Sequence, residues 1–440
     1  MKITSTYSVK IKHYNRLLKE TVWIYRRAVD FFVNAYLLEW EQIELLVGSK
    51  RKLNYIERLC ISTKKHPEVI YDFEHTDHAF YKFPCYLRRA AISEALGKVS
   101  SYKSNLKNGQ DASPPKAGFV YPAMYRDNMF VMTGTYTARI KVFVRNTWDW
   151  ISIDLKKSDV DYILHHCKDR KHCVPTLQKR GKEWFLDFVF EENTKLNDTN
   201  VYESRIVAVD LGINNACTCS IMTSDGTILG RRFLKLSKEQ DCLTHAVNRI
   251  KKAQQNRAKR TPRLWNRAKG INDDIAVKTA QFIIDTAVLY NGDVIVFEHL
   301  QLNGKKKGSK KQRLHLWKAK YVQSMVRDKA HRLSMRVSRV NAWGTSKYAY
   351  DGSGPVKRGR AADFDTYSLC RFTNGKVYNC DLSASYNIGA RYFLRELLKS
   401  FSEMERLHLE AKVPQVCKRS TCTLSTLISL NAELRSNVAA

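Results

Sequence analysis

Three features are missing from the sequence of 440 residues, and each absence excludes a class of protein. No apolar run approaches the roughly 20 residues that a membrane-spanning helix needs, and the amino-terminal residues alternate like a strand without the apolar core of a signal peptide. The 11 cysteines are scattered, and no two have the C-x-x-C spacing typical of zinc and redox sites. We therefore expect reduced thiols, no membrane partner, and a location in the bacterial cytosol or nucleoid.

Acidic residues are also scarce, since 43 Asp and Glu stand against 75 Lys and Arg and leave a formal net charge of +32. This excess is far larger than solubility requires, and it indicates a polyanionic partner. The basic residues are spread along the whole chain among 22 Tyr, 18 Phe and 8 Trp, which can stack on bases. Nucleic acid is therefore favoured over an anionic membrane surface, which would favour one concentrated basic amphipathic helix.

The length and the changing periodicity predict several domains. Residues 3–11 alternate as a strand, and apolar residues then recur at helical spacing through about residue 106. A turn-rich segment at 108–118 precedes strand-like runs over 128–192, where Arg180-Gly181-Lys182 predicts a hairpin turn. This order indicates a β-rich domain with a helical insertion, followed by a polar linker at 192–204.

The second half of the sequence alternates between strands and helices. RIVAVDLG and DVIVFEHL are predicted to be buried strands, with two further strands over 216–233 and a long basic helical region over about 236–289 between them. A basic loop at 304–311, a helix at 313–334, a strand MRVSRVNA and a helix at 381–397 follow. This pattern predicts an α/β domain with a largely parallel sheet.

Three carboxylates stand where this α/β pattern would bring them together. Asp210 ends the strand IVAVD, Glu298 ends the strand VIVFE, and Asp381 opens the last predicted helix. A carboxylate that closes a buried strand is poorly hydrated and needs a cation, and Mg²⁺ binds carboxylate oxygens readily. The carboxyl ends of parallel strands meet at one crevice of such a sheet. Two Mg²⁺ ions about 4 Å apart could there promote hydrolysis of a phosphodiester.

Each carboxylate also has a purely structural interpretation. Asp210 could stabilise a turn, Glu298 could pair with one of many basic neighbours, and Asp381 could be a helix cap. The order of the three residues, their elements and the basic charge of the chain together favour catalysis.

The same residues carry a resemblance to a known family. VAVDLGINNACTCSI, DVIVFEHLQLN and CDLSASYNIGARY resemble the three RuvC motifs of TnpB-type transposon-encoded nucleases and of the miniature type V CRISPR effectors (Cas12-like) derived from them. The resemblance covers about residues 205–395. It implies RNA-guided DNA cleavage, in which a guide RNA pairs with one strand of double-stranded DNA and the protein reads a short flanking motif.

The resemblance also implies a multidomain α/β fold, with a RuvC (RNase H-like) nuclease domain and an N-terminal β-barrel wedge domain that carries a helical recognition insertion. The expected bounds are 1–15 and 116–200 for the wedge domain, 16–115 for the recognition lobe, 201–341 and 379–400 for the RuvC domain, 342–378 for a degenerate zinc-ribbon-like insertion that binds target nucleic acid, and 401–440 for a C-terminal tail. The expected cofactors are two Mg²⁺ ions, with Mn²⁺ as a possible substitute, and a guide RNA. The chain is expected to act as a monomer or homodimer.

The sequence departs from the family pattern between the second and third motifs. Relatives commonly carry two C-x-x-C pairs there, which hold zinc. In this sequence Ala349 and Gly352 occupy the first pair, Thr373 replaces the second cysteine after Cys370, and Cys380 is out of register. We expect no zinc in this region, and we expect the loop to be held by aromatic packing. The aromatic residues are Tyr348, Tyr350, Tyr367 and Phe372.

One other segment could bind a metal. HHCKDRKHC at 165–173 gathers three histidines and two cysteines, although their spacing matches no known zinc pattern and a polar connection between strands explains them as well.

Several residues are candidates for contact with nucleic acid. A basic stripe with one tryptophan precedes the second motif and could follow a phosphate backbone, or it could be a solvated helix face. The stripe consists of Arg257, Arg260, Arg263, Trp265, Arg267 and Lys269. Asn387 and Arg391 follow Asp381 at helical spacing and could orient a substrate phosphate. In contrast, Val22, Tyr25, Val29 and Phe32 have the helical period of a core stripe and are not expected to stack on bases.

Two other functions remain open at this point. The chain could bind a guide RNA and DNA without cutting, although the three intact carboxylates argue against this. It could also be an unguided RuvC-type resolvase, although such a nuclease needs far less chain than the long basic amino-terminal half provides.

Overall fold

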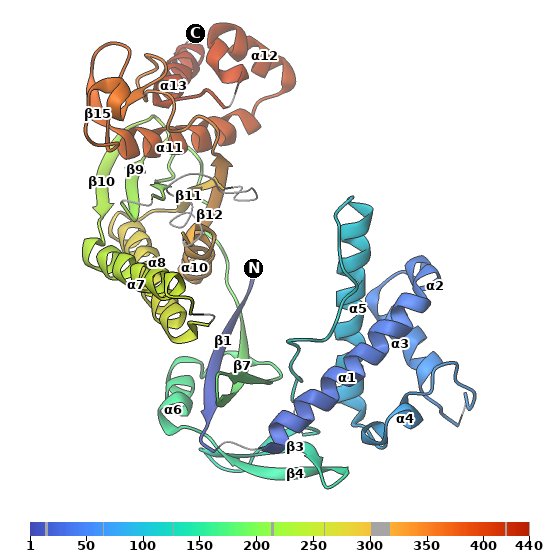
Figure 1. Cartoon of the computed structure of the whole chain (residues 1–440). Coiled ribbons are helices and arrows are strands. Elements are labelled where there is room, and N and C mark those ends of the chain that lie inside the picture. Colours follow the sequence, from blue (N-terminus) through green and yellow to red (C-terminus); the bar gives the residue numbers. More distant parts are fainter. Residues whose placement is uncertain are drawn as a thin grey trace. The chain divides into compact units, whose positions relative to one another are not determined.

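The computed structural model describes residues 1–13, 16–64, 66–125, 127–212, 215–258, 260–300, 317–418 and 420–439. The chain divides into two compact units, Lys2–Asn193 and Thr194–Ala440, and Met1 belongs to the second (Figure 1). The basic loop expected at 304–311 lies outside the described residues. None of the described helices combines the length and the apolar character that crossing a membrane requires.

The unit Lys2–Asn193 begins and ends on strands that pair with each other. β1 (Lys2–Ile11) runs antiparallel to β7 (Glu183–Asn193), so that Lys2 lies opposite Asn193. The predicted hairpin is present, because β6 turns into β7 through Gly181 at φ +62°. The other strands are β2 (Phe130–Met132), β3 (Thr137–Val144), β4 (Thr147–Asp154), β5 (Lys171–His172) and β6 (Thr176–Arg180).

These strands form two sheets and, among the described residues, no closed barrel. One sheet has the order β1-β7-β5 with β6 also paired to β7, and the other has the order β2-β3-β4. A single bridge between Ile11 of β1 and Leu155, directly after β4, links the two sheets. The amino-terminal unit is therefore β-rich as expected, but its strands are two linked sheets.

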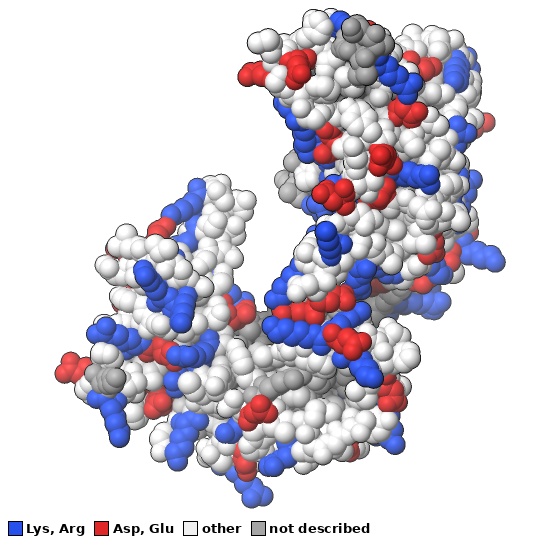
Figure 2. All heavy atoms as spheres, turned by 180° about the vertical axis from the view of Figure 1, so that it is seen from behind, with Lys and Arg blue, Asp and Glu red and all other residues white. Residues whose placement is uncertain are grey.

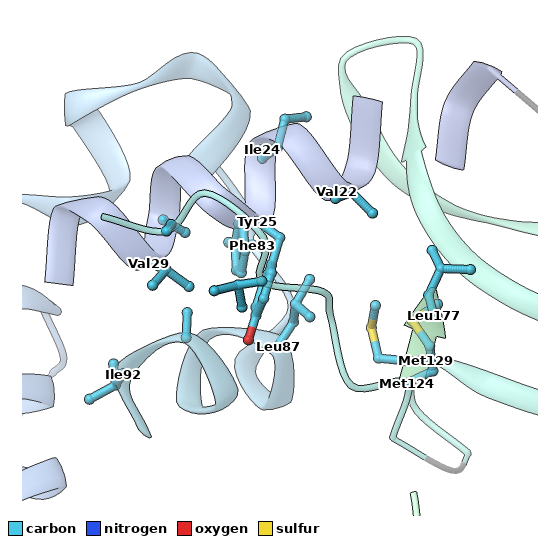
Figure 3. Close-up of a cluster of buried hydrophobic side chains, with 14 of the residues drawn as sticks. Val22, Ile24, Tyr25, Val29, Phe83, Leu87, Ile92, Met124, Met129 and Leu177 are labelled. Carbon is cyan, nitrogen blue, oxygen red and sulfur yellow. The ribbon is translucent and has the colours of Figure 1, made fainter. Parts of the chain in front are cut away.

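The helices of this unit are inserted mainly between β1 and β2. They are α1 (Arg16–Leu38), α2 (Trp40–Leu45), α3 (Ser49–Cys60), α4 (Phe73–Thr76), the 3-10 turn η1 (His78–Phe80), α5 (Cys85–Lys107) and, between β4 and β5, α6 (Lys157–His166). The apolar stripe of α1 is buried. Figure 3 shows Tyr25 of α1 reaching toward Phe83, which precedes α5, and toward Leu87 in α5. The prediction that this stripe is part of the core is therefore confirmed.

The unit Thr194–Ala440 is built on a five-stranded mixed sheet of order β10-β9-β8-β11-β12. β8 (Ile206–Asp210), β11 (Val294–His299) and β12 (Arg336–Asn341) are parallel, whereas β9 (Cys217–Met222) and β10 (Ile228–Leu234) continue the sheet antiparallel. The helices are α7 (Ser237–Gln255), α8 (Pro262–Leu289), α10 (Ala319–Arg332), α11 (Cys380–Lys399), α12 (Glu403–Lys412) and α13 (Leu424–Ala439).

Alternation along the central strands divides the core of this unit into two layers. Ile206 and Ala208 of β8 pack on the side of α11, whereas Val207 and Val209 pack with α8 and α10. β11 alternates in the same way and with the same parity, because Val207 lies opposite Ile295 and Val209 opposite Phe297. Gly389 lets α11 approach the sheet closely, since a Cβ atom there would lie 3.0 Å from Cε of Met222 and 3.2 Å from Cβ of Ala208.

The segment after α11 is ordered structure, where the sequence pattern gave no assignment. Ser402 and Glu405 form a capping box at the start of α12, and the 3-10 turn η3 (Pro414–Cys417) leads toward α13. Apolar residues of this segment, including Leu409, Leu427 and Leu430, share one core with α11 and the sheet. The elements α12, η3 and α13 therefore contribute to the core of this unit.

Residues 342–378 form a small layer of their own. β13 (Lys357–Arg358), β14 (Leu369–Arg371) and β15 (Val377–Asn379) make a three-stranded antiparallel sheet, with the 3-10 turn η2 (Gly359–Ala362) after β13. Its apolar cluster consists of Ala349, Cys370, Phe372 and Cys380, with Tyr350, Val356 and Tyr378 packed against it.

Candidate active site

The three predicted carboxylates lie on one face of the five-stranded sheet. Asp210 in β8 and Glu298 in β11 stand at the alternate positions whose side chains face α11. They lie near the ends of two adjacent parallel strands, in which Val209 lies opposite Phe297. Asp381 lies in the first turn of α11, the helix that packs on this face. The sheet and the helix thus bring together three residues that are far apart in the sequence.

Their electrostatics agree with this proximity. Burial raises the pKa of Asp210 well above its ordinary value, and the negative charges of Glu298 and Asp381 raise it further, against a weaker opposing effect of Arg358. Burial likewise raises the pKa of Glu298, while a hydrogen bond from Thr345 and the charge of Arg391 oppose that rise. A group of carboxylates in this environment favours a proton or a cation among them.

Neighbouring side chains hold two of these carboxylates in place. The Thr345 hydroxyl donates to Oε1 of Glu298, and the Asn215 amide donates to Oδ2 of Asp381 at 2.6 Å. Asn379 caps α11 by accepting from the backbone N–H groups of Asp381 and Leu382, both at 3.0 Å. In the part of the chain that is described, no three side chains of His, Cys, Asp and Glu are arranged to hold a metal ion as they stand.

A buried hydroxyl at the same place tests whether a metal fits. Thr218 lies opposite Asp210 in β9, and its hydroxyl has no hydrogen-bond partner among the described residues. Its neighbour Ser220 has the same parity and donates to Ser385 of α11 at 2.8 Å, so Thr218 faces the carboxylates. A buried polar group without a partner is unfavourable unless a ligand or water satisfies it. Three carboxylate donors and this free hydroxyl fit Mg²⁺ or Mn²⁺ with further polar ligands.

The structure places Asn387 and Arg391 in hydrogen bonds to the backbone of neighbouring loops. The Asn387 amide is fully buried and donates to the carbonyl oxygens of Thr345 and Tyr348, both at 2.9 Å. Arg391 is 5% exposed and donates to four backbone carbonyls at 2.6 to 3.1 Å. These carbonyls belong to Asn341, Trp343, Ser420 and Cys422. Both side chains therefore hold loops in place, and their contact with a substrate phosphate stays a prediction.

The predicted basic stripe is divided between a turn and two sides of one helix. Arg257 and Arg260 lie between α7 and α8, and Arg257 has φ +59°. Within α8 the pair Arg263 and Arg267 lies on one side of the buried stripe of this helix, and the pair Trp265 and Lys269 lies on the other. All six side chains are exposed. Figure 2 shows Lys and Arg spread over the visible face of the protein, where they outnumber Asp and Glu.

Aromatic packing holds residues 342–378 in part as expected. Tyr350 contacts Phe372 with ring centroids 5.6 Å apart, and Tyr378 at 5.0 Å. Tyr348 instead packs against Trp343, and Tyr367 is exposed while its ring lies against Gly359. The other candidate metal segment, 165–173, spans the end of α6 and β5, and Nδ1 of His166 is hydrogen-bonded to the carbonyl oxygen of Tyr162 at 2.9 Å.

Comparison with known proteins gives matches by sequence and by structure. The sequence model of a family described as the Aq_aa04 family matches residues 5–144. The chain is 28% identical over 236 residues to the TnpB-like protein aq_aa05 of Aquifex aeolicus (strain VF5), an alignment that covers 48% of this chain and 74% of that protein. The resemblance to TnpB-type proteins is confirmed.

A second relative and one solved structure extend the comparison with TnpB-like proteins. The uncharacterized protein aq_aa04 of the same organism is 27% identical over 149 residues, which cover 29% of this chain and 81% of that protein. The structure of a Cas12f1–sgRNA–target DNA complex matches with a TM-score of 0.51 and 14% identity over 76% of this chain and 73% of that chain. The chain therefore has a mixed α/β multidomain fold that resembles a Cas12-type effector.

Three residues around the site were not predicted from the sequence. Thr345, Asn215 and Arg358 each act on one of the carboxylates, by a hydrogen bond or by charge. Thr345 and Arg358 belong to the segment 342–378, for which the sequence predicted only the missing zinc ligands and the aromatic packing. Asn215 follows Asp210 in the first of the three motif-like strings. A polar residue close to a strand-end carboxylate can be expected from the sequence alone, so Asn215 is the one of the three that the sequence could have indicated.

Proposed function

We propose that this chain is an RNA-guided DNA endonuclease with one RuvC-type active site formed by Asp210, Glu298 and Asp381. The observation that carries the proposal is the meeting of these carboxylates at the ends of β8 and β11 and the start of α11, on one sheet face. The net charge of +32 supports a nucleic-acid substrate. The TnpB-like relative and the fold shared with a Cas12f1–sgRNA–target DNA complex support the guided class.

In this proposal, Mg²⁺ or Mn²⁺ held by the carboxylates would polarise the scissile phosphate and promote attack by water. The protein positions the metal-binding groups. Thr345 and Asn215 orient Glu298 and Asp381, and Gln323 fixes the strand end by donating to the carbonyl oxygen of Glu298 at 2.9 Å. Buried Arg391 and half-buried Arg358 provide positive charge that reduces repulsion among the carboxylates.

We assign the other parts of the chain by the same proposal. The strands of the unit Lys2–Asn193 would form the wedge domain, and α1 to α5 would form the helical recognition lobe. The exposed residues Arg257, Arg260, Arg263, Trp265, Arg267 and Lys269 would contact the nucleic acid, and residues 342–378 would be the target-nucleic-acid-binding insertion.

The experiment that tests the function is purification of the full chain from cells that also carry its native flanking DNA, followed by sequencing of the bound RNA. A discrete RNA that ends in variable sequence, together with Mg²⁺-dependent cleavage of matching DNA that is lost in Asp210→Ala, would establish the proposal. Bound RNA without cleavage would favour a guided binding protein, and cleavage of branched DNA without RNA would favour a resolvase.

A further inference from the structure

Beside the carboxylates lies a loop with exposed side chains that the catalytic proposal leaves unused. The loop Asn341–Tyr348 follows β12, and Thr345 of this loop donates its hydroxyl to Glu298. Two residues earlier, the Trp343 side chain is 53% exposed. A single exposed aromatic ring is common on protein surfaces. The position of this ring beside the carboxylate site is what makes it a candidate for contact with a ligand that enters there.

The loop is fixed from below by buried donors. Arg391 donates to the carbonyl oxygens of Asn341 and Trp343 at 2.9 and 2.8 Å, and Asn387 donates to those of Thr345 and Tyr348. The backbone N–H of Trp343 donates to Oδ1 of Asn341 at 2.9 Å. The backbone that carries Trp343 is therefore held on both sides, and little entropy would be lost when a ligand binds to it.

Two further side chains extend the exposed ring into a platform. Tyr348 lies with its ring centroid 6.3 Å from that of Trp343, and the ammonium of Lys347 lies 5.6 Å from the Trp343 centroid and 5.7 Å from the Tyr348 centroid. An aromatic ring with an adjacent exposed cation matches the chemistry of a nucleotide, whose base stacks and whose phosphate is anionic.

We propose that Trp343 stacks on an unpaired base of the DNA strand that enters the carboxylate site, while Lys347 contacts a phosphate of the same strand. The inference rests on the proposed function for its choice of DNA. Trp343 would be a positioning residue, because the loop that carries it also holds Glu298 through Thr345. Stacking at this point would fix the strand relative to the carboxylates.

The test measures stacking directly and without cleavage. The full chain, purified with its RNA, is titrated in EDTA with single-stranded DNA that carries one 2-aminopurine at successive positions, because stacking on tryptophan quenches this base. We expect quenching at one or two positions, its loss in Trp343→Ala with binding weaker by about 5- to 100-fold, and partial recovery in Trp343→Phe. Lys347→Gln should weaken binding and reduce its salt dependence by about one phosphate contact.

The matched control is Tyr202→Ala in the same unit. Tyr202 has the same exposed fraction as Trp343, 53%, and it precedes the start of β8, whereas Asp210 stands at the end of that strand. Unchanged quenching in Trp343→Ala, or an equal loss in Tyr202→Ala, would overturn the inference. Failure of the proposed function is distinguishable: wild-type protein would then cleave no DNA in Mg²⁺ while the quenching in EDTA remained.

Discussion

At the scale of single residues, the candidate site stores unfavourable electrostatic energy. Asp210 is crowded by the charges of Glu298 and Asp381, and burial deprives it of water. We expect Asp210→Asn, which keeps the shape and removes the charge, to abolish cleavage and yet to stabilise the metal-free protein by about 1–2 kcal/mol. Urea unfolding in EDTA measures this difference.

Asp328→Asn is the matched control, because Asp328 is an exposed carboxylate of the same unit that pairs with exposed Arg327. It should change the free energy of unfolding by no more than about 0.5 kcal/mol. Adding Mg²⁺ should raise the midpoint of thermal unfolding of the wild type but not of Asp210→Asn, because a ligand stabilises the state that binds it. A destabilised Asp210→Asn protein would show that Asp210 is needed for the fold.

The role of Arg391 can be separated from a role in substrate binding. Arg391→Met leaves four backbone carbonyls without their donor, and we expect a loss of about 3–5 kcal/mol in the free energy of unfolding. Arg263→Met, at an exposed position of α8, should leave stability within about 0.5 kcal/mol. If instead Arg391→Met unfolds like the wild type and only binds DNA more weakly, the contact with phosphate predicted from the sequence would be correct.

At the scale of elements, strong periodicity was predictive and short or mixed patterns were not. The helix α1 could be predicted because a long apolar stripe defines it, and the buried strands β8 and β11 could be predicted because each is an unbroken apolar run. α6 was missed since it buries only Val160 and Ile163, too few to distinguish a helix from a polar connection. The C-terminal helices had one readable signal, the capping box of Ser402 and Glu405.

The helix α13 gives the test of this correction. Leu427 is fully buried in the core that α13 shares with α11 and the sheet, whereas its neighbour Ile428 is 51% exposed. We expect Leu427→Ala to cost about 2–5 kcal/mol of unfolding free energy and Ile428→Ala to cost less than about 1 kcal/mol. Denaturant unfolding of the two variants measures the contrast. Equal, small effects would mean that residues 401–440 are a dispensable tail after all.

At the scale of the whole molecule, the strand-end carboxylates were predictable and their partners were not. The position of Asp210 and Glu298 follows from parallel strands that share one edge, a rule that needs no coordinates. The hydrogen bond from Thr345, the amide of Asn215 and the charge of Arg358 depend on how separate loops meet the sheet, and sequence spacing does not encode that meeting. The burial of Arg391 was missed for the same reason, because its acceptors lie in two loops distant in sequence.

The division into two units predicts that the chain can be separated between Asn193 and Thr194. Each unit has its own core, and the family whose model matches residues 5–144 is named for a separate Aquifex protein of which this chain covers 81%. We expect residues 1–193 and 194–440, expressed as two chains, each to unfold cooperatively. The second piece should keep the thermal shift with Mg²⁺, because it contains all three carboxylates, whereas guided cleavage should require both pieces.

A cut after Gly270, inside α8, is the control and should prevent folding of the second unit, since it interrupts the helix that covers one sheet face. Loss of the Mg²⁺ response in the intact second piece would mean that the metal site needs residues of the amino-terminal unit.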